Sequence, residues 1–113
     1  MTPAVVRLVT LVLVLLATPA FAEPVEVTAK VVEMPKKMIY CGVIAYRAVV
    51  RYEVITVDKG AYTPKEIFAV ELCPERLKVG AKRRLRLLKP AVAGNFHDEF
   101  QQRPGTRWAI AHR

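Results

Sequence analysis

The first 22 residues place the strongest constraint on what this chain can form. One positive charge, Arg7, precedes an apolar run at 8–17, and Pro19 and an Ala-Phe-Ala sequence follow the run. A charge, an apolar core and small residues in this order are typical of a secretory signal peptide. We therefore predict a signal peptide at 1–22, a secreted or periplasmic location, and a mature chain of residues 23–113.

The alternative for this segment is an uncleaved membrane anchor. Such an anchor needs about 20 apolar residues to cross the hydrocarbon core, and this apolar stretch is shorter and contains threonine and proline. A bacterial lipid anchor needs a cysteine at the cut, whereas the first cysteine is Cys41. We expect no transmembrane helix in the mature chain.

The mature chain is short enough for a single domain, which would benefit from a covalent constraint. Cys41 and Cys73 are its only cysteines, and an even number in an exported chain predicts a disulfide. A redox pair or a metal site is the alternative, but there is no Cys-x-x-Cys, and His97 and His112 are distant in sequence. We predict no metal and no cofactor.

Alternation of apolar and polar residues predicts an all-β domain. The expected strands lie at 25–31, 38–57 with a bend near Gly42, 67–73, 81–88 and 108–111, and turns at 58–60 and 77–80 separate some of them. A short helical segment is expected within 95–102. Five strands in a chain of this size predict a small OB-like barrel, because closure removes exposed sheet edges.

The Lys59-Gly60 and Val79-Gly80 turns, with the strands spaced around them, resemble netrin-like OB-fold modules. These modules include the inhibitory domain of tissue inhibitors of metalloproteinases, and the resemblance covers residues 25–88. It implies an OB fold. Those inhibitors insert a cysteine at the mature amino terminus into the zinc site of the protease, whereas this chain is predicted to begin with Glu23-Pro24. The resemblance therefore implies a fold more than a function.

The chain is basic, with 18 Lys and Arg against 10 Asp and Glu and a net charge of +8. A basic exported protein is attracted to anionic surfaces in general. Candidate anion-binding residues lie in and beside the strand at 81–88, where three of them share one face: Lys78, Lys82, Arg84, Arg86 and Lys89. The alternative is a solvated strand face whose charges deter aggregation.

Four tyrosines offer aromatic rings that could stack on bases or sugars beside those cations: Tyr40, Tyr46, Tyr52 and Tyr62. Tyr46 and Tyr52 share the apolar side of their segment, so core packing is favoured for this pair. His97-Asp98-Glu99 invites a metal or acid-base interpretation. Because consecutive side chains diverge, a surface turn is favoured.

No pattern in the sequence predicts an enzyme. The chain has no serine, both cysteines are assigned to a disulfide, and neither a phosphate loop nor a metalloprotease motif is present. We expect no catalytic residues. The favoured function is a non-enzymatic module, inhibitor-like or interacting with a protein partner in the envelope or extracellular space. The alternative is an envelope protein that binds polyanions or glycans.

Overall fold

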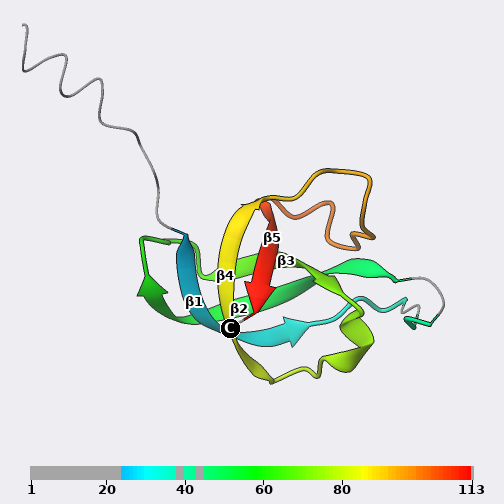
Figure 1. The fold of residues 1–113 in the computed structure, drawn as a ribbon, viewed down its shortest axis with the longest axis horizontal. Coiled ribbons are helices and arrows are strands. Elements are labelled where there is room, and N and C mark those ends of the chain that lie inside the picture. Colours follow the sequence, from blue (N-terminus) through cyan, green and yellow to red (C-terminus); the bar gives the residue numbers. More distant parts are fainter. Residues whose placement is uncertain (1–23, 38–39, 43–44, 113) are drawn as a thin grey trace, which may run out of the picture.

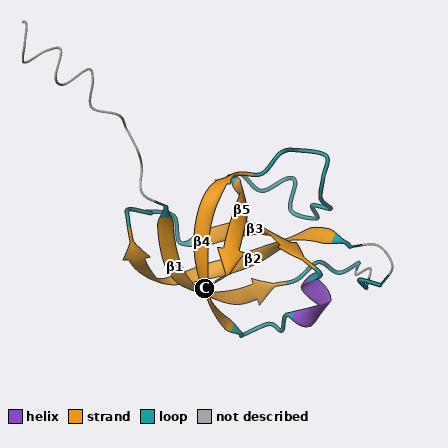
Figure 2. Cartoon of the chain, viewed as in Figure 1, coloured by secondary structure: helices purple, strands orange, loops and turns teal. Residues whose placement is uncertain are grey.

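The computed structural model describes residues 24–37, 40–42 and 45–112, so the predicted signal peptide at 1–22 lies outside the described residues. Five strands and one 3-10 turn make up the described fold (Figures 1 and 2). Their bounds are β1 Val25–Glu33, β2 Arg47–Lys59, β3 Glu66–Leu72, the turn η1 Pro74–Arg76, β4 Lys82–Pro90 and β5 Arg107–His112. In the part of the chain so described, no helix is long and apolar enough to cross a membrane.

The strands close into a barrel in the order β1-β2-β3-β5-β4. β3 and β5 pair in parallel, and the other neighbours pair antiparallel. This confirms the all-β, five-stranded OB-like barrel predicted from the alternating sequence. In Figure 1, β4 and β5 lie in front, and the loop that joins them, coloured orange, projects to one side.

The interior of the barrel is filled by alternate residues of the strands, as period-2 patterning requires. Tyr52 is fully buried among aliphatic side chains, which confirms its predicted core position, whereas Tyr46 is only half-buried. The core cluster consists of Val27, Ala29, Val31, Val50, Tyr52, Ile67, Ala69, Leu85 and Leu87.

The second strand begins later than predicted. β2 starts at Arg47, and residues 40–42 and 45–46 are not in a strand, while 38–39 and 43–44 lie outside the described residues. Cys41 instead donates its main-chain N–H to a carboxylate oxygen of Glu75, 2.9 Å away. The disulfide and this bond direct the segment to η1 rather than into the sheet.

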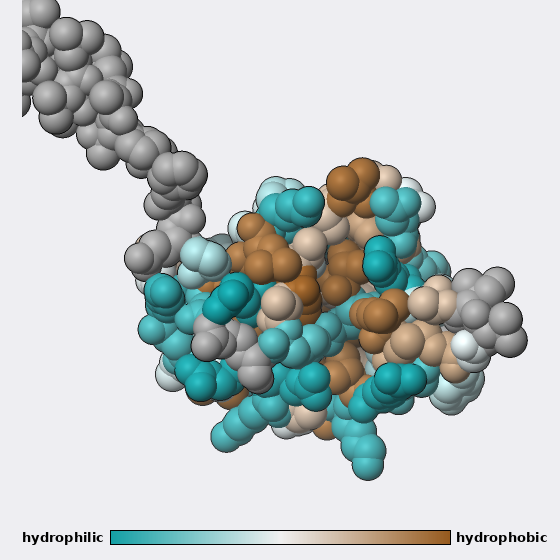
Figure 3. Space-filling model, in the orientation of Figure 1, coloured by the Kyte–Doolittle hydropathy of each residue, from teal (hydrophilic) through white to brown (hydrophobic). Residues whose placement is uncertain are grey.

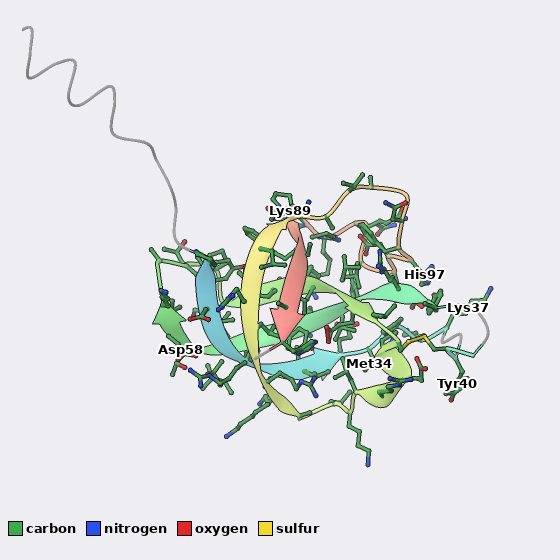
Figure 4. All side chains as sticks on the ribbon, in the orientation of Figure 1. Met34, Lys37, Tyr40, Asp58, Lys89 and His97 are labelled. Atoms are coloured by element: carbon green, nitrogen blue, oxygen red, sulfur yellow. A yellow bond between two sulfur atoms is a disulfide. The ribbon has the colours of Figure 1, made fainter. Side chains whose placement is uncertain are left out.

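The predicted disulfide is confirmed. Cys41 and Cys73 are bonded with their Cα atoms 5.4 Å apart (Figure 4), within the range that a disulfide needs. Cys73 has a φ of 54°, a left-handed conformation that turns the chain from β3 into η1. Pro74 follows at the start of this 3-10 turn, where its missing N–H costs nothing.

The helical segment predicted within 95–102 is wrong, because the main chain there forms other bonds. His97 accepts a hydrogen bond from the N–H of Val49 and donates one to the carbonyl of Arg47, each at 2.9 Å. Asp98 accepts the N–H of Phe100 through its side chain at 2.8 Å, which is a side-chain turn and competes with a helix. The short helical segment of the described chain is η1 instead.

The loop between β4 and β5 covers the outer surface of β2 and β3. Phe100 and Phe96 from the loop pack on strand residues Val49, Phe68 and Val70. Arg107 lies over the Phe68 ring at 4.3 Å and pairs with Asp98 at 2.7 Å. In OB folds the strand 2 and 3 face is the usual ligand surface. Here the loop covers the part of that surface around Val49 and Phe68.

Removing the disulfide should destabilise the barrel. The bond joins residues 32 apart, and closing a loop of that length is worth about 3 to 4 kcal/mol in the chain-entropy description. We expect this loss in the double variant C41S/C73S, measured by equilibrium unfolding in urea. The control is the wild-type protein unfolded in the presence of reductant, and its free energy of unfolding should match that of the variant. Equal stability of the oxidised wild type and the variant would contradict the prediction.

Protonation of Glu99 should make the protein less stable at acidic pH than at neutral pH. Burial alone would raise the pKa of Glu99, but the N–H groups of Lys37 and Lys36, each 2.9 Å away, together with His97, lower it. A lowered folded-state pKa stabilises the fold above the ordinary value of 4.5, and this contribution is lost as the pH falls through the folded-state value.

We expect Glu99→Gln to unfold more easily near pH 7 and to lose less stability between neutral and acidic pH than the wild type. Urea unfolding at a series of pH values measures both effects. Glu53→Gln, at an exposed position on β2, is the control. The prediction fails if both variants follow the same pH profile.

Candidate functional site

The structure brings together three of the five residues predicted to bind anions. Lys82, Arg84 and Arg86 lie in a row on the outer face of β4, next to the outward residues of β1, with which they pair in register. Leu85 and Leu87 alternate with them and point into the core, as predicted. Lys78 lies in the turn before β4, and Lys89 lies at the far end of the strand (Figure 4).

Carboxylates on neighbouring strands compensate part of this row. Arg86 pairs with Glu26 at 3.2 Å, and Arg84 lies 4.0 Å from Asp58. Hydrogen bonds from the hydroxyls of Thr28 and Thr56 lower the pKa of Asp58 and keep it charged. The row is therefore a face of alternating charge rather than a continuous basic stripe.

The predicted His97-Asp98-Glu99 group holds the long loop in place. His97 and Glu99 contact each other at 3.1 Å, while Asp98 turns away to Arg107. Tyr46 lies beside the His97 ring, with centroids 6.2 Å apart. Each of the three side chains thus has a structural partner, in agreement with the favoured interpretation as a turn.

A groove lies where the pairing of β3 with β5 ends, and we call it the seam groove. The parallel ladder runs from Phe68 and Arg107 to Val70 and Ala109 and stops there. Beyond this point a hollow of about 400 Å³ opens between the two strands and the start of the long loop. Its apolar lining is Val70, Leu72, Val92, Phe96, Ala109 and Ile110.

Small side chains explain why the seam groove stays open. Ala109 is the outward residue of β5 at this point, and Ala91 lines the groove from the loop. Two cations, Arg47 and Lys89, stand in the lining, and both are exposed. Figure 3, which views the molecule from the side of β4 and β5, shows apolar surface gathered on this face with hydrophilic residues around it.

A chain of polar side chains bridges the seam inside the barrel. Glu71, only 3% exposed, accepts hydrogen bonds from the Tyr52 hydroxyl at 2.6 Å and from His112 at 2.7 Å. Arg83 lies 3.1 Å from Nδ1 of His112. Because a guanidinium can only donate, Nδ1 accepts, and the proton on Nε2 faces Glu71.

This polar chain affects the chemistry of both Tyr52 and His112. Burial, followed by the nearby Glu71 carboxylate, strongly raises the pKa of Tyr52, so the phenol stays protonated and donates. Both ring nitrogens of His112 are engaged, so the imidazole has no free lone pair for proton abstraction. The arrangement closes the end of the barrel where main-chain pairing is missing.

One cluster of potential metal ligands occurs among the described residues: Cys41, Cys73 and Glu75. Both sulfurs are committed to the disulfide, and one Glu75 oxygen accepts the N–H of Cys41. Thiolate is the form of cysteine that binds metals, so the oxidised cluster lacks the two ligands it would need.

No family model, no curated protein and no solved structure matches this chain. The netrin-like resemblance therefore stays a prediction.

Lys89 is the one residue of the seam groove that the sequence predicted to bind a ligand. Arg47 and Ala109 are far apart in the sequence, and neither belongs to a recognisable motif. The only signal was the pair of alanines in Trp108-Ala-Ile-Ala111, which are small residues on the outer side of a closing strand. That pattern alone does not say what lies above them.

Replacing Tyr52 with phenylalanine should destabilise the barrel although the ring is kept. The buried Glu71 carboxylate would lose one of its two hydrogen bonds, at a cost of about 1 to 3 kcal/mol. Urea unfolding of Tyr52→Phe measures the loss. Tyr40→Phe, at a side chain that is 74% exposed, is the matched control and should be neutral. Equal stability of both variants would argue against a role for the bond.

Proposed function

We propose that this protein is an exported, non-enzymatic module that binds a protein partner through the seam groove. One observation carries the proposal: the seam groove is an apolar hollow of about 400 Å³ with a few polar groups, next to the part of the usual OB ligand face that the long loop covers. Leu72 and Val92 in its lining are large apolar side chains that are exposed. Such surfaces on small domains mark interaction sites.

The absence of catalytic activity is part of this proposal. His112 is the titratable ring nearest to the groove, and Arg83 and Glu71 engage both of its nitrogens. The sulfurs of Cys41 and Cys73 are joined, so neither is a nucleophile. Export to an oxidising space is supported by the same disulfide.

A polyanion or glycan remains the second candidate, because Lys82 and Arg84 are exposed on the outer face of β4. The ion pairs of Arg86 and Arg84 weaken this candidate relative to the groove. Binding of that kind falls steeply with salt, which separates it from an apolar contact.

Filling the groove should abolish partner binding. Ala109→Trp places an indole in the hollow, and Val79→Trp adds the same indole at an exposed turn that does not line the groove. We expect immobilised wild type and Val79→Trp to retain the same protein from an extracellular or envelope extract, and Ala109→Trp to retain at least about tenfold less, as expected for a residue at the centre of a contact.

Thermal unfolding of Ala109→Trp establishes that the variant is folded. The outcome that would contradict the proposal is retention by both tryptophan variants alike. The polyanion candidate predicts a different result. The protein would bind heparin, this binding would be lost at high salt and in the variant K82A/R84A, and Ala109→Trp would keep it.

A further inference from the structure

We infer that the occupant of the seam groove is an extended segment of the partner in which a carboxylate stands next to apolar side chains. This inference rests on the proposed function and adds the chemistry of the ligand. Three features of the groove carry it: the two exposed cations, the apolar walls, and the strand residues that lie beyond the end of the β3–β5 ladder.

The first feature is charge. Arg47 and Lys89 are exposed at the groove, and neither forms an ion pair with another residue that the structure describes. The one carboxylate in the lining, Glu71, is directed to Tyr52 and His112 instead. Two cations with no ion-pair partner among the described residues, beside an apolar hollow, favour an anionic group on the ligand. A carboxylate matches a guanidinium in geometry.

The second feature is extent. Leu72 is 55% exposed and Val92 is 68% exposed although both belong to the lining, so a large part of the apolar surface at the hollow stays in water. A small ligand that fills only part of the hollow would leave some of these side chains exposed. An extended segment with several apolar side chains would cover them as well.

The third feature is the main chain. Glu71 on β3 and Ile110 on β5 both line the groove, and each is the residue that follows the last pair of the ladder on its strand. The ladder between β3 and β5 has already ended at Val70 and Ala109. Main-chain groups beyond a ladder can bond to an added extended segment, as in strand-addition recognition.

A lipid surface is the other class of ligand that combines apolar and anionic groups. Membrane-binding surfaces protrude so that their apolar side chains reach the acyl region. Here the apolar residues line a hollow, and two of the lining residues, Ala109 and Ala91, have small side chains. The shape therefore favours a peptide segment.

Selection from a phage-displayed library of random nonapeptides tests the inference. Three forms of the oxidised protein are used: wild type, the charge-reversed variant R47E/K89E, and Ala109→Trp. We expect wild type to enrich peptides with Asp or Glu beside two or more apolar residues. The R47E/K89E variant should bind those peptides at least about tenfold more weakly, because two exposed charge pairs are replaced by repulsion, and should enrich Lys or Arg instead.

The outcomes separate this inference from the proposed function. Wild type could enrich apolar peptides without a preference for Asp or Glu, while Ala109→Trp enriches none. That result would overturn the inference but leave the groove as a binding site. No enrichment over Ala109→Trp would overturn both. Wild type could instead bind phosphatidylglycerol vesicles, enrich no peptide, and lose vesicle binding in Ala109→Trp and R47E/K89E. That result would assign the groove to a lipid surface.

Discussion

The short parallel ladder between β3 and β5 is the contact on which the rest of this structure depends. It closes the barrel, and it spans only the residues from Phe68 to Val70 on β3. Where it ends, side chains replace the main chain: Glu71 and His112 join across the gap. The same early end leaves the seam groove on the outside. Closure and the candidate site are thus two results of one incomplete ladder.

The long loop after β4 determines which surface of the barrel remains available. Its phenylalanines cover Val49 and Phe68, so a part of the face that OB folds usually offer to ligands belongs to a second hydrophobic core. Glu99 and Asp98 fasten the loop, one to main-chain N–H groups of the β1–β2 segment and one to Arg107. The beginning of the loop then forms one wall of the seam groove. The same segment therefore covers one part of the outer β2–β3 surface and forms a wall of the groove beside it.

The sequence predicted correctly those elements that depend on the pattern of neighbouring residues along the chain. The alternation of Val27, Ala29 and Val31 placed a strand correctly, because burial of one face needs only the period of the chain. The helical expectation for 95–102 failed because the main chain of His97 bonds to β2, a partner distant in sequence. The start of β2 was misplaced for a similar reason, since the bond from Cys41 to Glu75 directs that segment elsewhere.

The sequence by itself determined the strand-rich character, the basic charge and the identity of the disulfide, because composition, period and a count of two cysteines need no knowledge of neighbours in space. Tertiary structure alone decided that Glu26 and Asp58 would compensate part of the basic row, and that Arg47 and Lys89 would meet at one apolar hollow with no ion-pair partner among the described residues. Charge compensation and concavity both depend on which distant strands become adjacent. Only the closed barrel specifies that adjacency.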